Sequence, residues 1–152
     1  MIKFAILLCI VLLCGFVGYV ISLYFKNRML IYADIIKMIT YFKGEIYFLQ
    51  TDFKTLLKRQ SYGKGVNNVL ENYLKTGQAS TNVLRHNEVA ELTNCLNSIG
   101  KKDVDGEINN LNYYESLFQR KFSETKAFYD KYGVLIVKLS IIAGALISVV
   151  LM

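Results

Sequence analysis

The sequence predicts an all-α membrane protein in which a helical bundle is flanked by two transmembrane helices. Two long apolar blocks, Phe4 to Phe25 and Val134 to Met152, stand at the two ends of the 152 residues. Between them, apolar residues recur in steps of three and four, the spacing of one helix face. The absence of proline favours long, unbroken helices. We therefore expect an N-terminal transmembrane helix over residues 1–25, a helical bundle domain over 26–131 and a C-terminal transmembrane helix over 132–152.

The first apolar block has the length and composition of a membrane span. Phe4 to Phe25 contains no charged residue, and about 20 apolar residues cross the hydrocarbon core as a helix. A cleaved signal peptide is the alternative, but it needs a small-x-small cleavage site, and the block is followed by Lys26, Asn27 and Arg28. Cys14 follows two leucines, whereas a lipidation signal has a small residue before its cysteine. We therefore expect an uncleaved anchor.

The second apolar block is interrupted by Lys138. Leu139 to Met152 alone is too short to span a bilayer, and a buried core helix is the alternative. Lys138 lies near the start of the block, however, where a long side chain reaches back to the membrane interface. Counted from Tyr132, the helix is roughly 30 Å long. These observations favour a second span.

The charges beside the two blocks predict the orientation. Residues 26–131 hold 16 of the 18 Lys and Arg and all 12 acids, a net charge of 16 − 12 = +4. The positive-inside rule counts the Lys and Arg near the ends of each span. These lie mostly on the central side of both blocks, so we expect two spans in the cell membrane and a cytoplasmic central domain. The basic residues nearest the blocks are Lys26, Arg28, Lys37, Lys43, Arg120, Lys121, Lys126 and Lys131.

Residues of the kinds found at membrane interfaces and between packed helices recur in both blocks. Tyr24, Tyr32 and Tyr132 are candidates for the aromatic belt at the interface. Small residues recur every four positions in each block, a spacing that lets helix backbones approach closely in a bilayer. They are also common in spans without such a role. The two small-residue stripes are Cys14, Gly18 and Ser22 in the first block and Ser140, Gly144 and Ser148 in the second.

The central segment is expected to form several helices of unequal length. Its first helix carries an apolar face that includes Ile35, Ile39 and Phe42, and a turn follows over Ser61 to Gly65. A short helix then ends at Gly77, and another covers about Asn82 to Ile99. Asp103 is expected to cap a long final helix with apolar residues including Leu111 and Phe118 on one face. No segment alternates with the period of a strand, so we expect no sheet.

No catalytic constellation is visible in this sequence. His86 is the single histidine and lies in a polar stretch, where it is expected to be solvated. Cys9, Cys14 and Cys95 lack the spacing of zinc or redox sites and are expected to act as small hydrophobic residues. Gly63-Lys64-Gly65 lacks the other residues of a phosphate-binding loop. We expect no enzyme, metal or cofactor, and no nucleic-acid partner, because the mild positive charge fits anionic lipid.

Short motifs at three places in the chain match the pattern of one known family. Tyr41 to Phe53 resembles the family pattern L-x-x-E-I-x-Y-x-x-T-P-L, with Asp52 in place of the proline. Ile99 to Glu107 resembles L-G-x-x-D-x-x-G-Q, and the segment from Lys131 to Gly133 resembles the K-Y-G that precedes the family's final span. The residues in register in the first motif are Glu45, Ile46 and Thr51. Together the three motifs resemble those of the stage III sporulation protein AB family of endospore-forming bacteria.

The resemblance implies a non-catalytic platform or scaffold subunit. The family is similar to the F-type platform proteins of type II secretion and type IV pilus systems, and it belongs to a channel complex between mother cell and forespore. The implied location is the mother-cell membrane facing the forespore. The implied partners are other membrane subunits of the channel complex and a secretion-type ATPase on the cytoplasmic side, and an oligomer is possible.

Two further expectations concern the docking surface and an alternative function. Polar candidates for docking a partner are the basic turn Lys58-Arg59 and the acidic residues Asp103, Asp105 and Glu107. A two-span membrane-tethered sensor or signalling module is the alternative function, because it would use the same plan of anchors around a helical domain.

Overall fold

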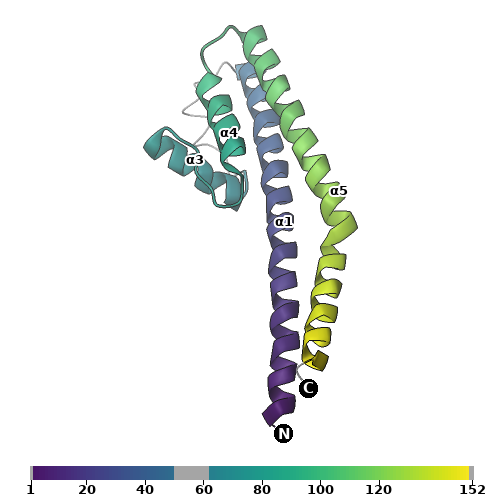
Figure 1. The fold of residues 1–152 in the computed structure, drawn as a ribbon. Helices are drawn as coiled ribbons and strands as arrows, with labels where there is room; N and C mark the ends of the chain where they lie inside the picture. Colours follow the sequence, from purple (N-terminus) through teal and green to yellow (C-terminus); the bar gives the residue numbers. More distant parts are fainter. Residues whose placement is uncertain (1, 50–61, 151–152) are drawn as a thin grey trace. The chain divides into compact units, whose positions relative to one another are not determined.

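The computed structural model describes residues 2–49 and 62–150, and these form an all-α structure. Within this part of the chain four helices are found and no strands. They are α1 (Ile2–Leu49), α3 (Lys64–Thr76), α4 (His86–Ser98) and α5 (Val104–Val150) (Figure 1). The predicted fold class is confirmed. The residues Thr51, Asp52, Lys58 and Arg59 lie outside the described residues.

The two long helices each run through two compact units. One unit, the anchor unit, comprises Met1–Asn27 and Glu124–Met152, and the other, the helical unit, comprises Arg28–Ser123. The helix α1 continues past Phe25 without a break, and α5 continues past Tyr132 in the same way. The predicted spans are therefore the ends of longer helices rather than separate elements.

The helical unit packs all four helices around one apolar core. The periodicity of its sequence explains which residues are inside, because residues three or four apart share one helix face. α1 contributes the largest group, and Tyr32, Met38 and Phe42 are fully buried. Other core residues are Ile35 and Ile39 of α1, Val66, Val69 and Leu70 of α3, Leu92, Cys95 and Leu96 of α4, and Leu111 and Phe118 of α5.

The short helices begin and end at identifiable residues. α3 follows Gly63 and ends at Gly77, which adopts a left-handed conformation with φ 73° and donates its N–H to the Tyr73 carbonyl. α4 begins at His86, four residues later than the Asn82 start predicted. Arg85 is extended (φ −71°, ψ 157°), and its N–H donates to Glu88 Oε2 at 2.9 Å. This carboxylate satisfies an otherwise free donor and fixes the start of α4 there.

Candidate functional site: a paired helix anchor and a helical unit

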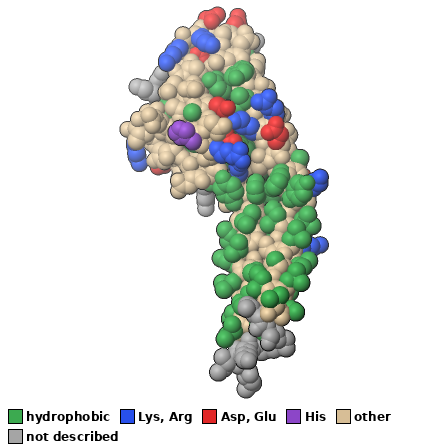
Figure 2. All heavy atoms as spheres, in the orientation of Figure 1, with side chains coloured by type: hydrophobic (Ala, Val, Ile, Leu, Met, Phe, Trp, Pro, Cys, Tyr) green, Lys and Arg blue, Asp and Glu red, His purple; other side chains and the backbone are tan. Residues whose placement is uncertain are grey.

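The anchor unit presents apolar side chains on its outside. The most apolar 18-residue windows of α1 and α5 have mean hydropathies of 2.8 and 2.4, and only 6% and 11% of them are buried. A core helix of a soluble protein would be mostly buried. Figure 2 shows the hydrophobic side chains covering this part of the surface. Both helices are long and apolar enough to cross a membrane.

The two small-residue stripes meet across the helix pair of the anchor unit. A Cβ atom added at Gly18 would lie 2.6 Å from the Cβ of Ser140, and one added at Gly144 would lie 2.8 Å from the Cβ of Cys14. Real Cβ atoms essentially never approach this closely, so glycine is required at both positions unless the helices separate. Ser148 Oγ also lies 3.2 Å from the Leu7 carbonyl oxygen and can donate to it.

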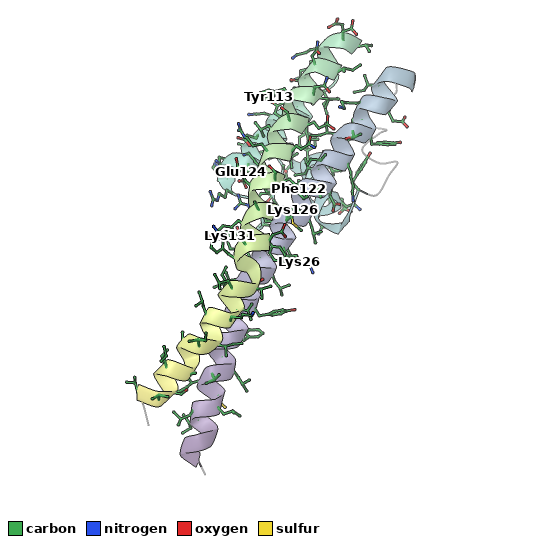
Figure 3. The ribbon with its side chains drawn as sticks, turned by 90° about the vertical axis from the view of Figure 1, so that its right-hand side faces the viewer. Lys26, Tyr113, Phe122, Glu124, Lys126 and Lys131 are labelled. Carbon is green, nitrogen blue, oxygen red and sulfur yellow. The ribbon has the colours of Figure 1, made fainter. Side chains whose placement is uncertain are left out.

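Aromatic rings and lysines follow the apolar surface of the anchor unit. The ring of Phe25 on α1 lies 4.7 Å from that of Phe128 on α5, and Phe128 lies 4.9 Å from Tyr132. Tyr24 packs edge-on against Phe25 at 5.7 Å. We name Tyr24, Phe25, Phe128 and Tyr132 the aromatic cluster. Rings with polar tips beside lysines are typical of the boundary between lipid and water, and the exposed lysines here are Lys26, Lys126 and Lys131 (Figure 3).

Tyr32 was expected to lie at this boundary, and that prediction is wrong. The side chain is fully buried in the helical unit, and its ring lies 6.4 Å from that of Phe118. It also belongs to a buried polar group. Arg28 Nε donates to the Tyr32 hydroxyl at 3.1 Å, and the Arg28 guanidinium forms an ion pair with Glu88 of α4.

The pKa values of this buried group follow from its contacts. Burial alone would raise the pKa of Glu88, but hydrogen bonds from the Arg85 backbone and Tyr32, together with the charge of Arg28, outweigh burial and lower the pKa below 4.5. Burial also raises the pKa of Tyr32 to about 12, so the hydroxyl stays neutral. Glu88 thus both starts α4 and ties it to α1.

Two further ion pairs connect the helices of the helical unit. Lys43 on α1 pairs with Glu115 on α5 at 2.5 Å, and Thr40 Oγ1 donates to the same carboxylate at 2.8 Å. Lys121 on α5 pairs with Glu91 on α4. These pairs join α5 to both α1 and α4.

The acidic turn before α5 divides into exposed and buried residues. Asp103 and Asp105 are exposed, as are the neighbouring Lys101 and Lys102, so the accessible turn carries both signs of charge. Glu107 is buried, and its Oε1 accepts the backbone N–H groups of Lys101 at 2.8 Å and Lys102 at 2.9 Å. The Glu107 carboxylate therefore holds the turn, and of the three acidic docking candidates only Asp103 and Asp105 are accessible to a partner.

One surface feature of the helical unit was not found from the sequence. Tyr113 on α5 is 61% exposed. Arg120 lies seven residues further along and is also exposed, so the two residues share a helix face. Tyrosine and arginine are enriched at the energetic centres of protein interfaces. An unusual exposed ring is visible only once burial is known.

The described residues show no arrangement suited to metal binding. Across residues 2–49 and 62–150, no three His, Cys, Asp or Glu side chains lie together as possible ligands. His86 is exposed at the start of α4. Burial, with a smaller contribution from the charge of Glu107, raises the pKa of the Cys95 thiol to about 12, which makes this core cysteine unreactive.

Comparisons with known proteins give one family. The model of the family described as stage III sporulation protein AB matches residues 59–152. No curated protein and no solved structure matches the chain. The matched region contains α3, α4 and α5, and thus parts of both the helical unit and the anchor unit.

Proposed function

Because the chain belongs to the stage III sporulation protein AB family, we propose that it is a non-catalytic scaffold subunit of a sporulation-specific, secretion-like channel between mother cell and forespore. The anchor unit would cross the mother-cell membrane that faces the forespore. The helical unit would lie in the cytoplasm and dock a secretion-type ATPase. ATP would then be hydrolysed by the partner, and this chain would hold it beside the other membrane subunits.

The observation that carries the proposal is the division of α1 and α5 between the two units. Each helix has one end in the apolar anchor unit and the other in the polar, ion-paired helical unit. A scaffold needs helices that run through both units, because a force on the docked partner must be transmitted to the membrane. The bias of Lys and Arg toward the central residues supports a cytoplasmic helical unit.

The exposed face of α5 is the surface proposed for docking. Tyr113 and Arg120 would supply the anchoring contacts, and the aspartates Asp103 and Asp105 would add polar contacts near the start of the helix. A few well-placed aromatic and arginine side chains contribute most of the binding energy in protein interfaces. The same face would exclude water around those contacts when the partner is bound.

The test is co-purification of the tagged full chain from sporulating cells. We expect a secretion-type ATPase to be recovered with the wild-type chain and to fall at least roughly tenfold with the Tyr113→Ala/Arg120→Ala variant, the size of effect typical of interface centres. Lys75→Ala, an exposed change on α3, is the control and should leave recovery unchanged. Recovery of channel subunits without any ATPase would contradict the docking role.

A further inference from the structure

Two lysines project from the same face of α5 in the anchor unit. Lys131 and Lys138 are seven residues apart, which places them on one side of a helix and about 10.5 Å apart along its axis. Both are exposed, and so is Leu135 between them. Among residues 2–49 and 62–150, neither lysine forms an ion pair.

The surroundings of Lys138 are apolar and exposed. Val134, Leu139 and Ile142 are all exposed next to it, and Figure 2 shows Lys or Arg side chains at the margin of the apolar surface. An ammonium group inside hydrocarbon is costly, so such a lysine extends toward the interface or meets an anion. Extension toward the interface brings the Lys138 ammonium toward Lys131.

Lys131 lies beside the aromatic cluster. Its Nζ atom lies 5.0 Å from the centroid of the Tyr132 ring, and Tyr132 packs against Phe128 at 4.9 Å. Glu124 shares this face of α5 (Figure 3), but it lies two turns before Lys131 and four before Lys138. Residues 132–137, between the two lysines, contain no acidic residue, and the nearest one, Asp130, directly precedes Lys131.

We propose that Lys131 and Lys138 together bind the phosphate of an anionic phospholipid in the cytoplasmic leaflet. The phosphate would lie between the two ammonium groups at the level of Tyr132, and an acyl chain would follow Leu135 and Leu139 into the bilayer. Two fixed positive charges favour a headgroup with a net negative charge over a zwitterionic one, whose own cation they repel. The inference rests on the proposed two-span placement of the anchor unit.

The test is native mass spectrometry of the full chain released from detergent containing phosphatidylglycerol or phosphatidylcholine. We expect the wild-type chain to retain phosphatidylglycerol preferentially. Lys131→Gln/Lys138→Gln should weaken this retention by roughly 30-fold, the combined effect of two basic residues at a membrane surface. The single variant Lys138→Arg keeps both positive charges and should retain phosphatidylglycerol as the wild type does.

The matched control removes the same charge from elsewhere in the anchor unit. Lys26→Gln/Lys126→Gln should leave the lipid preference unchanged, because Lys126 lies on another face of α5 and Lys26 on α1 (Figure 3). Equal retention of both lipids by the wild type, or equal loss in both double variants, would overturn the proposal. So would loss of a co-purified membrane subunit, rather than lipid, from the Lys138→Gln variant.

A separate measurement distinguishes failure of the lipid site from failure of the membrane placement. Extraction of the wild-type chain from membranes by alkaline carbonate would contradict the two-span placement itself. A chain that resists carbonate but shows no preference for phosphatidylglycerol would overturn the lipid site alone.

Discussion

At the scale of single residues, Arg28 and Glu88 form a buried ion pair in the helical unit. Arg28 is the second basic residue after the first apolar block, and it joins α1 to α4 across 60 positions of the sequence. The Tyr32 hydroxyl accepts a hydrogen bond from Arg28 and so completes the group. Replacing both partners of a buried charge pair destabilises a protein far less than replacing one, because a single replacement leaves the other charge buried without a partner.

We therefore predict a large effect of Glu88→Ala and a small effect of a paired replacement. Glu88→Ala leaves the Arg28 charge buried without its partner and should lower the free energy of unfolding by about 3–5 kcal/mol. Arg28→Met/Glu88→Leu should recover most of that loss. Urea titration of the full chain in detergent, followed by circular dichroism, measures both. As control, Lys37→Ala breaks a surface pair with Asp34 and should change stability by less than about 1 kcal/mol.

The same group predicts how stability depends on pH. The pKa of Glu88 is lowered from 4.5 in the folded protein, so its contribution is complete above pH 4.5 and is lost as the pH falls through the lower, folded-state value. Unfolding midpoints measured between pH 7 and pH 3 should decrease less in Arg28→Met/Glu88→Leu than in the wild type. Equal decreases in the two proteins would show that Glu88 is not paired as described.

The burial and pairing of Arg28, Glu88 and Tyr32 could not be predicted from the sequence. The sequence identifies Arg28 as a flanking charge that sets orientation. Its position next to the apolar block does not indicate that it forms a buried ion pair. Its partner could not be identified, because Glu88 lies on another helix and the pairing depends on how the helices pack. Tyr32 was misplaced for the same reason, since a tyrosine near a span has the same sequence pattern whether it faces lipid or a protein core.

At the scale of elements, the sequence predicted the helices and their apolar faces correctly but placed the start of α4 incorrectly. The apolar spacing predicted the faces of α1, α3 and α5, and Gly77 predicted the end of α3. The start of α4 was placed too early, because the Glu88 carboxylate that ends the extended backbone at Arg85 acts through a specific hydrogen bond. The contact is local, spanning three residues, but Arg85 is not one of the usual residues before a helix, so the sequence pattern did not indicate it.

The pairing of α1 and α5 in the anchor unit depends on Gly144. We predict that Gly144→Ile separates the helices, because its Cβ would lie 2.8 Å from Cys14 Cβ and 3.1 Å from Val11 Cα, and overpacking of this kind costs about 1–3 kcal/mol. Cysteines introduced at positions 7 and 148, where the Leu7 backbone carbonyl oxygen lies 3.2 Å from Ser148 Oγ, report the pairing by oxidative cross-linking.

Cross-linking at these positions requires few other changes. Cys9 and Cys14 are replaced by alanine, while Cys95 stays, since its pKa of about 12 keeps the buried thiol protonated. Gly144→Ile should reduce the intramolecular cross-link strongly. Ala145→Ile, a change of similar size at an exposed position, should not reduce it. Equal yields in the two variants would mean that the small-residue stripes do not hold the helices together.

At the scale of the whole molecule, composition carried most of the information. The two apolar blocks and the uneven distribution of charge predicted two spans and a cytoplasmic domain before any contact was known. The structure adds that the apolar parts of both helices are exposed rather than buried. Composition could not indicate the surface proposed for docking, because exposed Tyr113 and buried Glu107 have the opposite burial from the one their residue types suggest.

The central claim is that the anchor unit crosses the membrane and leaves the helical unit in the cytoplasm. It is tested most directly by labelling Asn68→Cys, an exposed position on α3, with a membrane-impermeant maleimide, using the wild-type chain as the control for its own cysteines. We expect no added labelling in intact cells and full labelling after the cells are opened. Labelling of position 68 in intact cells would place the helical unit outside and contradict the scaffold function.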